Sequence, residues 1–203
     1  MKWTSIFIFL FMIARPVAAM QIEADPRTIS SFMDKSLTPA LDILQVTTDI
    51  SADNHLLFRV KTRGEQVDEE NNDYVLLQIL HEKTYLFLLP LNKTKTEKAL
   101  VYEGTLDPEN HKLSETSGKF TEYNLPAGFT ATRTVRGAEF TIPLDWINYA
   151  ADFNFDAYTI QASTPGNTLQ IDKVYDQARK GRKEEKRYSA ITLLNKICSP
   201  KKR

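Results

Sequence analysis

The sequence is short of the residue types that hold a small fold together by covalent or metal bonds. Among its 203 residues are one cysteine, Cys198, and three histidines. A single cysteine cannot form a disulfide within its own chain, and the scattered histidines do not have the spacing of metal ligands. We therefore expect a fold held by hydrophobic packing, without a metal site or a cofactor.

Long hydrophobic runs are also scarce, except at the N-terminus. A positive start, an apolar run over residues 3–14 and small residues at 17–19 follow one another as in a signal peptide. Arg15 interrupts the run, which is too short to span a bilayer, although an uncleaved anchor is the alternative. We expect a signal peptide over residues 1–19, cleavage after Ala19, and a secreted or periplasmic chain.

The formal net charge of zero hides an imbalance along the chain. Residues 20–172 carry 23 acidic and 13 basic residues, a net charge of −10, whereas residues 173–203 carry 11 basic and 3 acidic residues, a net charge of +8. The basic end is therefore expected to rest on the acidic domain itself, on a protein partner or on an anionic surface. Because the chain is expected to be exported, we expect no nucleic-acid partner.

The stretch Gly137–Ala150, GAEFTIPLDWINYA, shows the pattern on which the fold prediction depends. Phe140 and Ile142 alternate with polar residues, and this period of two indicates a strand with one buried face. Pro143 cannot donate to a sheet, so the strand ends there or lies at an edge. We expect Trp146 to close the core as a large apolar side chain.

Several other segments have the same character. Leu41–Ile50 and His55–Thr62 predict a hairpin, and Tyr74–Leu80 and Tyr85–Leu91 are apolar at nearly every position, as expected of strands covered on two faces. About eight short strands without helices between them predict an all-β fold, an antiparallel β-sandwich over residues 20–172.

From residue 173 the pattern changes to a basic segment. Tyr188, Ile191, Leu194 and Cys198 fall on one side of a helix if the segment is helical. We predict an appended basic C-terminal helix over Lys173–Cys198, within a C-terminal part that comprises residues 173–203.

Two stretches resemble the β-sandwich carbohydrate-binding modules of family 9 and the broader DOMON-like domains. Residues 41–64, LDILQVTTDISADNHLLFRVKTRG, are similar to the opening strand pair of that family, and residues 138–147, AEFTIPLDWI, are similar to its Glu-x-x-Ile-Pro run. The resemblance covers roughly residues 25–165 and implies a sandwich fold. Sugar-binding members use exposed aromatic residues, often paired tryptophans, whereas Trp146 is expected in the core here.

The candidate ligand-binding residues are Tyr123, Asn124 and Phe129. Aromatic faces beside amide groups are suited to sugars, although the simpler interpretation is that the two rings pin a long polar loop to the fold. The run Asp68–Glu70, followed by Asn71–Asp73, offers oxygen atoms to Ca²⁺ but lacks the EF-hand pattern, so a solvated acidic loop is the simpler interpretation.

The sequence contains none of the usual catalytic constellations of nucleophile, base and orienting group. We therefore predict an exported, non-catalytic binding module with a glycan as its expected ligand. The alternative is an accessory or interaction subunit of an envelope or secreted assembly, docked through the basic helix. A hydrolase with an unrecognised site is the third hypothesis.

Overall fold

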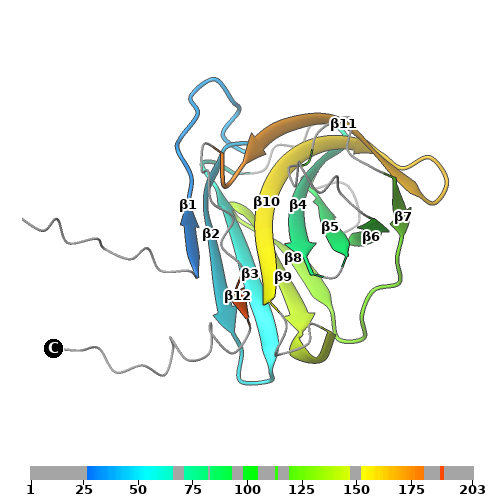
Figure 1. The fold of residues 1–203 in the computed structure, drawn as a ribbon. Coiled ribbons are helices and arrows are strands. Elements are labelled where there is room, and N and C mark those ends of the chain that lie inside the picture. Colours follow the sequence, from blue (N-terminus) through cyan, green and yellow to red (C-terminus); the bar gives the residue numbers. More distant parts are fainter. Residues whose placement is uncertain are drawn as a thin grey trace, which may run out of the picture.

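The computed structural model describes residues 27–65, 71–81, 83–92, 98–104, 113, 119–146, 152–180 and 188–189. The predicted signal peptide and the acidic run Asp68–Glu70 lie outside these residues. Within them the chain is all-β, its strand pairs are antiparallel, and it contains no α-helix. The elements, drawn in Figure 1, are β1 (Thr28–Ser30), β2 (Ile43–Ile50), β3 (His55–Thr62), β4 (Asp73–Leu80), β5 (Thr84–Pro90), β6 (Leu100–Gly104), β7 (Phe120–Glu122), β8 (Thr130–Thr134), β9 (Gly137–Pro143), the 3₁₀ turn η1 (Leu144–Trp146), β10 (Asp152–Ser163), β11 (Thr168–Gln177) and β12 (Tyr188–Ser189).

The first layer is a five-stranded sheet in the order β1-β2-β3-β9-β8, which we call the open sheet. The predicted hairpin of β2 and β3 is confirmed, with Val46 opposite Val60 in register. In β3 and β9 the residues alternate between buried and more exposed positions, and Phe58 lies opposite Phe140 on the buried face. This alternation arises because one face of the sheet packs on a core while the other meets water.

The second layer closes on itself. Its strands run in the order β11-β7-β6-β5-β4-β10, and β11 pairs with β10 as well, so that six strands form a ring that we call the barrel. Figure 1 shows β11 arching from β10 across to β7. The register between β10 and β11 shifts after Thr159 and again after Gln161. Such irregularities bend a strand, which lets a sheet curl into a barrel. The predicted antiparallel all-β fold is therefore confirmed, but one layer is a barrel.

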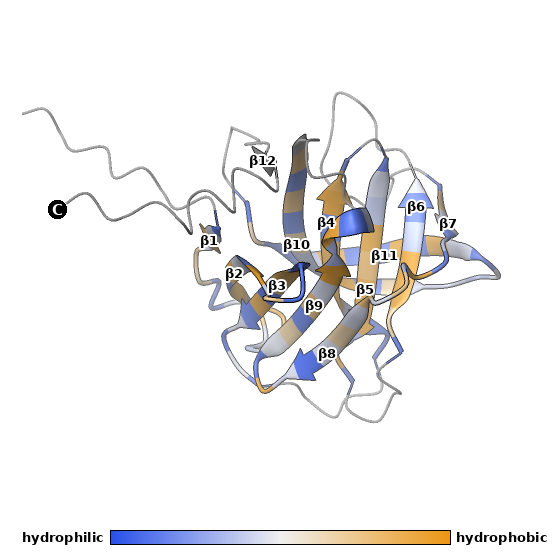
Figure 2. Cartoon of the chain, turned by 90° about the horizontal axis from the view of Figure 1, so that it is seen from below, coloured by the Kyte–Doolittle hydropathy of each residue, from blue (hydrophilic) through white to orange (hydrophobic). Residues whose placement is uncertain are grey.

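The two layers create two separate cores. Phe58 of the open sheet and Phe155 of β10 meet between the layers, with ring centroids 5.1 Å apart. Alternate residues of β4 point to different cores: Leu77 joins the core between the layers, whereas Leu76 lies in the barrel interior. Figure 2 shows hydrophobic colours along most of β4. The prediction that this strand is covered on both faces is confirmed.

Buried carboxylates form hydrogen bonds where the open sheet meets the barrel. Asp176 of β11 accepts a hydrogen bond from the backbone N–H of Ile43 in β2 at 2.8 Å, and another from Lys180 Nζ at 2.9 Å. Asp42, whose side chain is fully buried, accepts from Arg63 Nε at 2.6 Å. The end of β11 is thus joined directly to a strand of the other layer.

The predicted C-terminal helix over Lys173–Cys198 is wrong in two described segments. Residues 173–177 belong to β11, and β12 pairs with Asp152 and Phe153 of β10. The reason is ring closure, because β11 must reach β7 with its first residues and β10 with the rest. The boundary predicted after residue 172 therefore falls inside a strand. Residues 178–180 form a turn, and the rest of the predicted helix, residues 181–187 and 190–198 with Cys198 included, lies outside the described residues.

Candidate functional site: an aromatic corner

The predicted residues Tyr123 and Phe129 lie at the two ends of the loop between β7 and β8. Tyr123 is half-buried and meets the ring of Tyr85 edge-on, with centroids 5.6 Å apart. Phe129 is also half-buried and stacks on Phe87, with centroids 5.1 Å apart and an angle of 19° between the rings. The third predicted residue, Asn124, is exposed in the same loop.

Trp146 joins these rings. The sequence placed it in the core, but its side chain is only partly buried, at the edge of the core between the layers. Its ring meets Tyr85 at 4.6 Å and Phe87 at 5.4 Å, both edge-on. The difference arises because β9 ends at Pro143 and the turn η1 carries Trp146 past the end of the sheet. The contacts thus link the partly buried rings of Tyr85, Tyr123, Phe129 and Trp146 through the buried Phe87, and we call these four rings the aromatic corner.

Backbone contacts hold the loop of the corner in place. The N–H of Tyr123 donates to Val101 O of β6 at 2.8 Å, and the N–H of Phe129 donates to Pro126 O at 3.0 Å. Gly128 has a φ of +84°, and a Cβ built there would lie 3.3 Å from Pro143 and 3.4 Å from His55 Nε2. The loop therefore spans from the barrel to the ends of β3 and β9, where the core between the layers reaches the surface.

Polar groups lie beside the rings. Lys83 Nζ donates to both carboxylate oxygens of Glu103, at 3.1 and 3.2 Å, and Glu103 is opposite Tyr85 in the register of β5 and β6. The hydrogen bond to Glu103 and its negative charge raise the pKa of Lys83 above its ordinary value, with smaller contributions from Tyr85 and Tyr123. The corner thus combines partly exposed rings with a cation, a carboxylate and the exposed amide of Asn124.

This arrangement suits binding through ring faces and hydrogen bonds. One face of Phe129 is covered by Phe87, so its exposed part lies away from that ring. Partly exposed aromatic faces accept the C–H groups of a ligand, and the polar groups beside them fix its orientation. Among the described residues, no cluster of three or more His, Cys, Asp or Glu side chains is arranged to hold a metal ion.

Sequence reasoning found two rings of the corner and missed the others. The sequence pattern predicts Tyr85 to be an ordinary core residue, because it lies at the start of an apolar strand. It predicts Trp146 to be the last buried residue of a strand. The alternation of β5 was the available signal for Tyr85, since it shares a face with Phe87.

Comparison with known proteins gives no identification. No protein-family model matches the chain, and neither a curated protein nor a solved structure matches it. In the part of the chain that the structure describes, no helix has the length and apolar character needed to span a bilayer.

Proposed function

We propose that this chain is an exported, non-catalytic binding module that holds a carbohydrate at the aromatic corner. The observation that supports this proposal is that two predicted ligand residues, Tyr123 and Phe129, share one partly exposed cluster with Trp146. The proposal agrees with the resemblance of the strand motifs to carbohydrate-binding modules. It also adds a partly exposed tryptophan, Trp146, to the candidate site, whereas the sequence alone placed that residue in the core.

A sugar ring has apolar C–H faces and polar edges, and the corner offers partners for both. Ring faces supply contact area at little cost in side-chain entropy, because they are already held by their neighbours. The Lys83–Glu103 pair and Asn124 supply a donor, an acceptor and an amide. Because the rings are fixed by the fold, the site needs little rearrangement before it binds.

The test is a thermal-shift screen with neutral and acidic oligosaccharides, followed by calorimetry with any saccharide that binds. Tyr123→Leu keeps apolar bulk but removes the ring, and we expect about tenfold weaker binding, since an aromatic contact is worth roughly 1 kcal/mol or more. Tyr123→Phe keeps the ring and serves as the matched control. Unchanged binding by the Leu variant, or no saccharide that binds at all, would contradict the proposal.

A second candidate function is an interaction subunit that docks through its basic C-terminal part. The observation that favours it is that β12 pairs with β10, which places part of the segment beyond β11 against the barrel. The helix was predicted over Lys173–Cys198; its part outside the described residues stays a prediction and would be the docking element. Association with a native partner should be lost when the chain ends after Lys180, and equal association of both forms would count against this function.

A further inference from the structure

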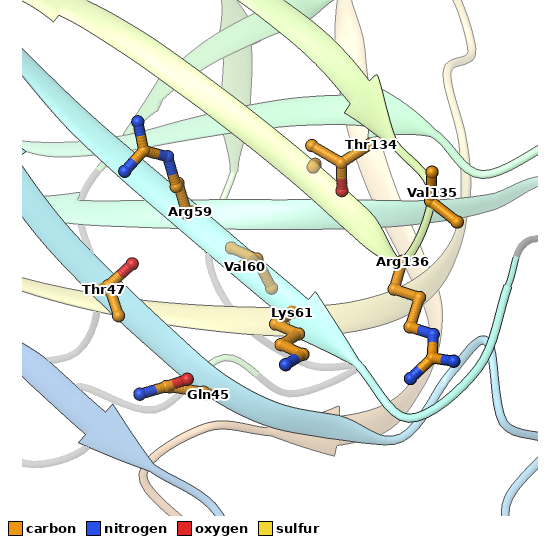
Figure 3. A pocket seen from close by; sticks show the side chains of 9 residues that line it. Gln45, Thr47, Arg59, Val60, Lys61, Thr134, Val135 and Arg136 are labelled. Atoms are coloured by element: carbon orange, nitrogen blue, oxygen red, sulfur yellow. The ribbon is translucent and has the colours of Figure 1, made fainter.

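A hollow lies on the outer face of the open sheet, on the side away from the core between the layers. Its volume is about 550 Å³. Figure 3 shows the side chains that line it: they come from β2, from β3 and from the β8–β9 hairpin. The lining side chains with hydrogen-bonding groups are Gln45, Thr47, Arg59, Lys61, Thr134 and Arg136.

Strand register explains why the hollow exists. Gly137 lies opposite Lys61 of β3 on one side and opposite Thr134 of β8 on the other. It contributes no side chain between them, and its φ of +111° together with the nearby Val60 carbonyl excludes any larger residue. The depression between Lys61 and Thr134 is therefore built into the backbone.

The charge of the hollow is positive. Arg59 donates through Nε to Glu139 Oε2, an exposed ion pair in which one cation and one carboxylate balance. Lys61 and Arg136 are exposed, and within the described residues neither has a carboxylate partner. Two cations with no carboxylate partner in the described part of the chain thus border the hollow, although the expected mature chain before residue 173 carries more acidic than basic residues. A local positive field of this kind attracts anionic ligands.

The remaining lining residues are the uncharged polar residues Gln45, Thr47 and Thr134 and the apolar residues Val60, Val135 and Ala138. Gln45 and Thr47 from β2 face Thr134 from β8 across the hollow, and they provide hydroxyl and amide groups that both donate and accept. The lining contains no aromatic ring, so a ligand here is held by hydrogen bonds, charge and contact with aliphatic side chains, in contrast to the aromatic corner. Such a mixture suits a ligand that is rich in hydroxyl groups and carries negative charge.

We propose that the hollow is a binding site for an acidic saccharide, that is, a sugar chain that bears carboxylate or sulfate groups. Lys61 and Arg136 bind the acidic groups by charge-assisted hydrogen bonds, and the threonine and glutamine side chains bind the sugar hydroxyls. Arg59 contributes less than the other two cations because Glu139 already neutralises it. This site is separate from the aromatic corner, and the inference does not depend on the function proposed there.

The experiment measures binding by calorimetry at low salt to three hexasaccharides: a galacturonic acid oligomer, a chondroitin sulfate oligomer and uncharged maltohexaose. We expect one or both acidic oligomers to bind, maltohexaose to bind at least about tenfold more weakly, and acidic binding to weaken as salt screens the charges. The carboxylated and sulfated oligomers distinguish the two kinds of acidic group.

Two variants with opposite expected effects on the binding of acidic oligomers identify the site. Lys61→Gln combined with Arg136→Gln should weaken acidic binding about tenfold, whereas Glu139→Gln should tighten it roughly threefold, because it removes a negative charge but keeps an acceptor for Arg59. Lys119→Gln, at an exposed cation beside β7, is the matched control and should change nothing. Each variant is checked for an unchanged melting temperature.

Three outcomes would overturn the inference: no binding of either acidic oligomer at low salt, equal binding of maltohexaose, or unchanged binding in the Lys61 and Arg136 double variant. Tyr123→Leu should leave binding at the hollow unaffected. If instead that variant abolishes acidic binding while the double variant does not, the ligand sits at the aromatic corner and the hollow is not its site.

Discussion

The open sheet and the barrel use their strands differently. In β3 of the open sheet the buried residues Phe58 and Val60 alternate with the exposed residues Arg59 and Lys61. In β4 of the barrel, every residue from Tyr74 to Ile79 is buried. The barrel encloses one core and covers another, so both faces of β4 are covered and leave no room for a ligand. Both proposed sites accordingly lie on the outer face of the open sheet or at its border with the barrel.

A truncation that opens the barrel tests this difference between the two layers with the largest expected effect. A chain that ends after Ile171 lacks the part of β11 that pairs with Tyr158 to Gln161 of β10, and it also loses the contact of Asp176 with β2. We expect this chain not to fold cooperatively, because the ring of the barrel cannot close and a typical total stability is only about 5–15 kcal/mol. Circular dichroism and urea unfolding measure the effect.

A chain that ends after Ser189 is the control for this truncation, because it keeps both β11 and β12. It should unfold in one cooperative transition. If the chain ending after Ile171 unfolded with the same midpoint, closure of the ring would contribute nothing to stability, and the barrel would be no more than an open second layer.

Alanine substitutions at neighbouring positions measure whether one face or both faces of a strand are packed. The side chains of Leu76 and Leu77 point to opposite faces of β4, and both are fully buried. Each alanine substitution should therefore lower the free energy of unfolding by roughly 2–5 kcal/mol. In the open sheet, Phe58→Ala should cost roughly 3–5 kcal/mol, whereas its neighbour Leu57→Ala, on the outer face, should cost less than about 1 kcal/mol. Chemical denaturation of the four variants provides the measurement.

A small cost for either leucine of β4 would show that one face of that strand is not packed as the structure indicates. A large cost for Leu57→Ala would show that the outer face of the open sheet is covered in solution. The second result would bear directly on the hollow, since Leu57 lies on the same face as Arg59 and Lys61.

The open sheet was predictable from sequence because one of its faces is exposed to water, so polar and apolar residues alternate along its strands. The alternation in residues 55–62 and 138–142 specifies which side chains point inward, and the fold confirms it. The barrel was not predictable in the same way. A continuous apolar run shows that both faces are covered but not what covers them, and closure depends on β11 meeting both β7 and β10.

The candidate sites show the same limit. Tyr123 and Phe129 could be selected by residue type, but Tyr85 and Trp146 join them only through the pairing of β5 with β6 and the turn η1. Lys61 and Arg136, two cations of the hollow, are separated by about 75 residues in the sequence. The pairing of Lys61 with Gly137 brings Arg136 close to Lys61. No periodicity within one segment carries that information.

The two cores also differ in chemistry, and this leads to a prediction about pH. The core between the layers includes buried hydroxyl groups such as that of Thr48, opposite Phe58, whereas the barrel side of β10 carries the buried carboxyl group of Asp156. Its Oδ2 accepts from Gln177 Nε2 at 2.7 Å and its Oδ1 from the N–H of Ala157 at 2.8 Å. Burial nevertheless dominates and raises the pKa of Asp156 from its ordinary value of 3.8 to about 6.

Between these two pKa values the folded state binds more protons at Asp156 than the unfolded state does. The contribution of this group to stability is therefore fully present below about pH 4 and is lost as the pH rises through about 6, by roughly 3 kcal/mol in total. Other carboxylates titrate in the same range, so the contribution of Asp156 must be measured as a difference between proteins.

Asp156→Asn provides that difference, because it removes the titration but keeps a polar side chain at the same place. The unfolding free energy of the wild-type protein minus that of the variant should fall by roughly 3 kcal/mol between pH 4 and pH 7. Leu77→Ala, in the core between the layers, is the control and should cost the same amount at both pH values. A difference for Asp156→Asn that did not change with pH would mean that water reaches this carboxyl group, and that the barrel interior is less well sealed than the core beside it.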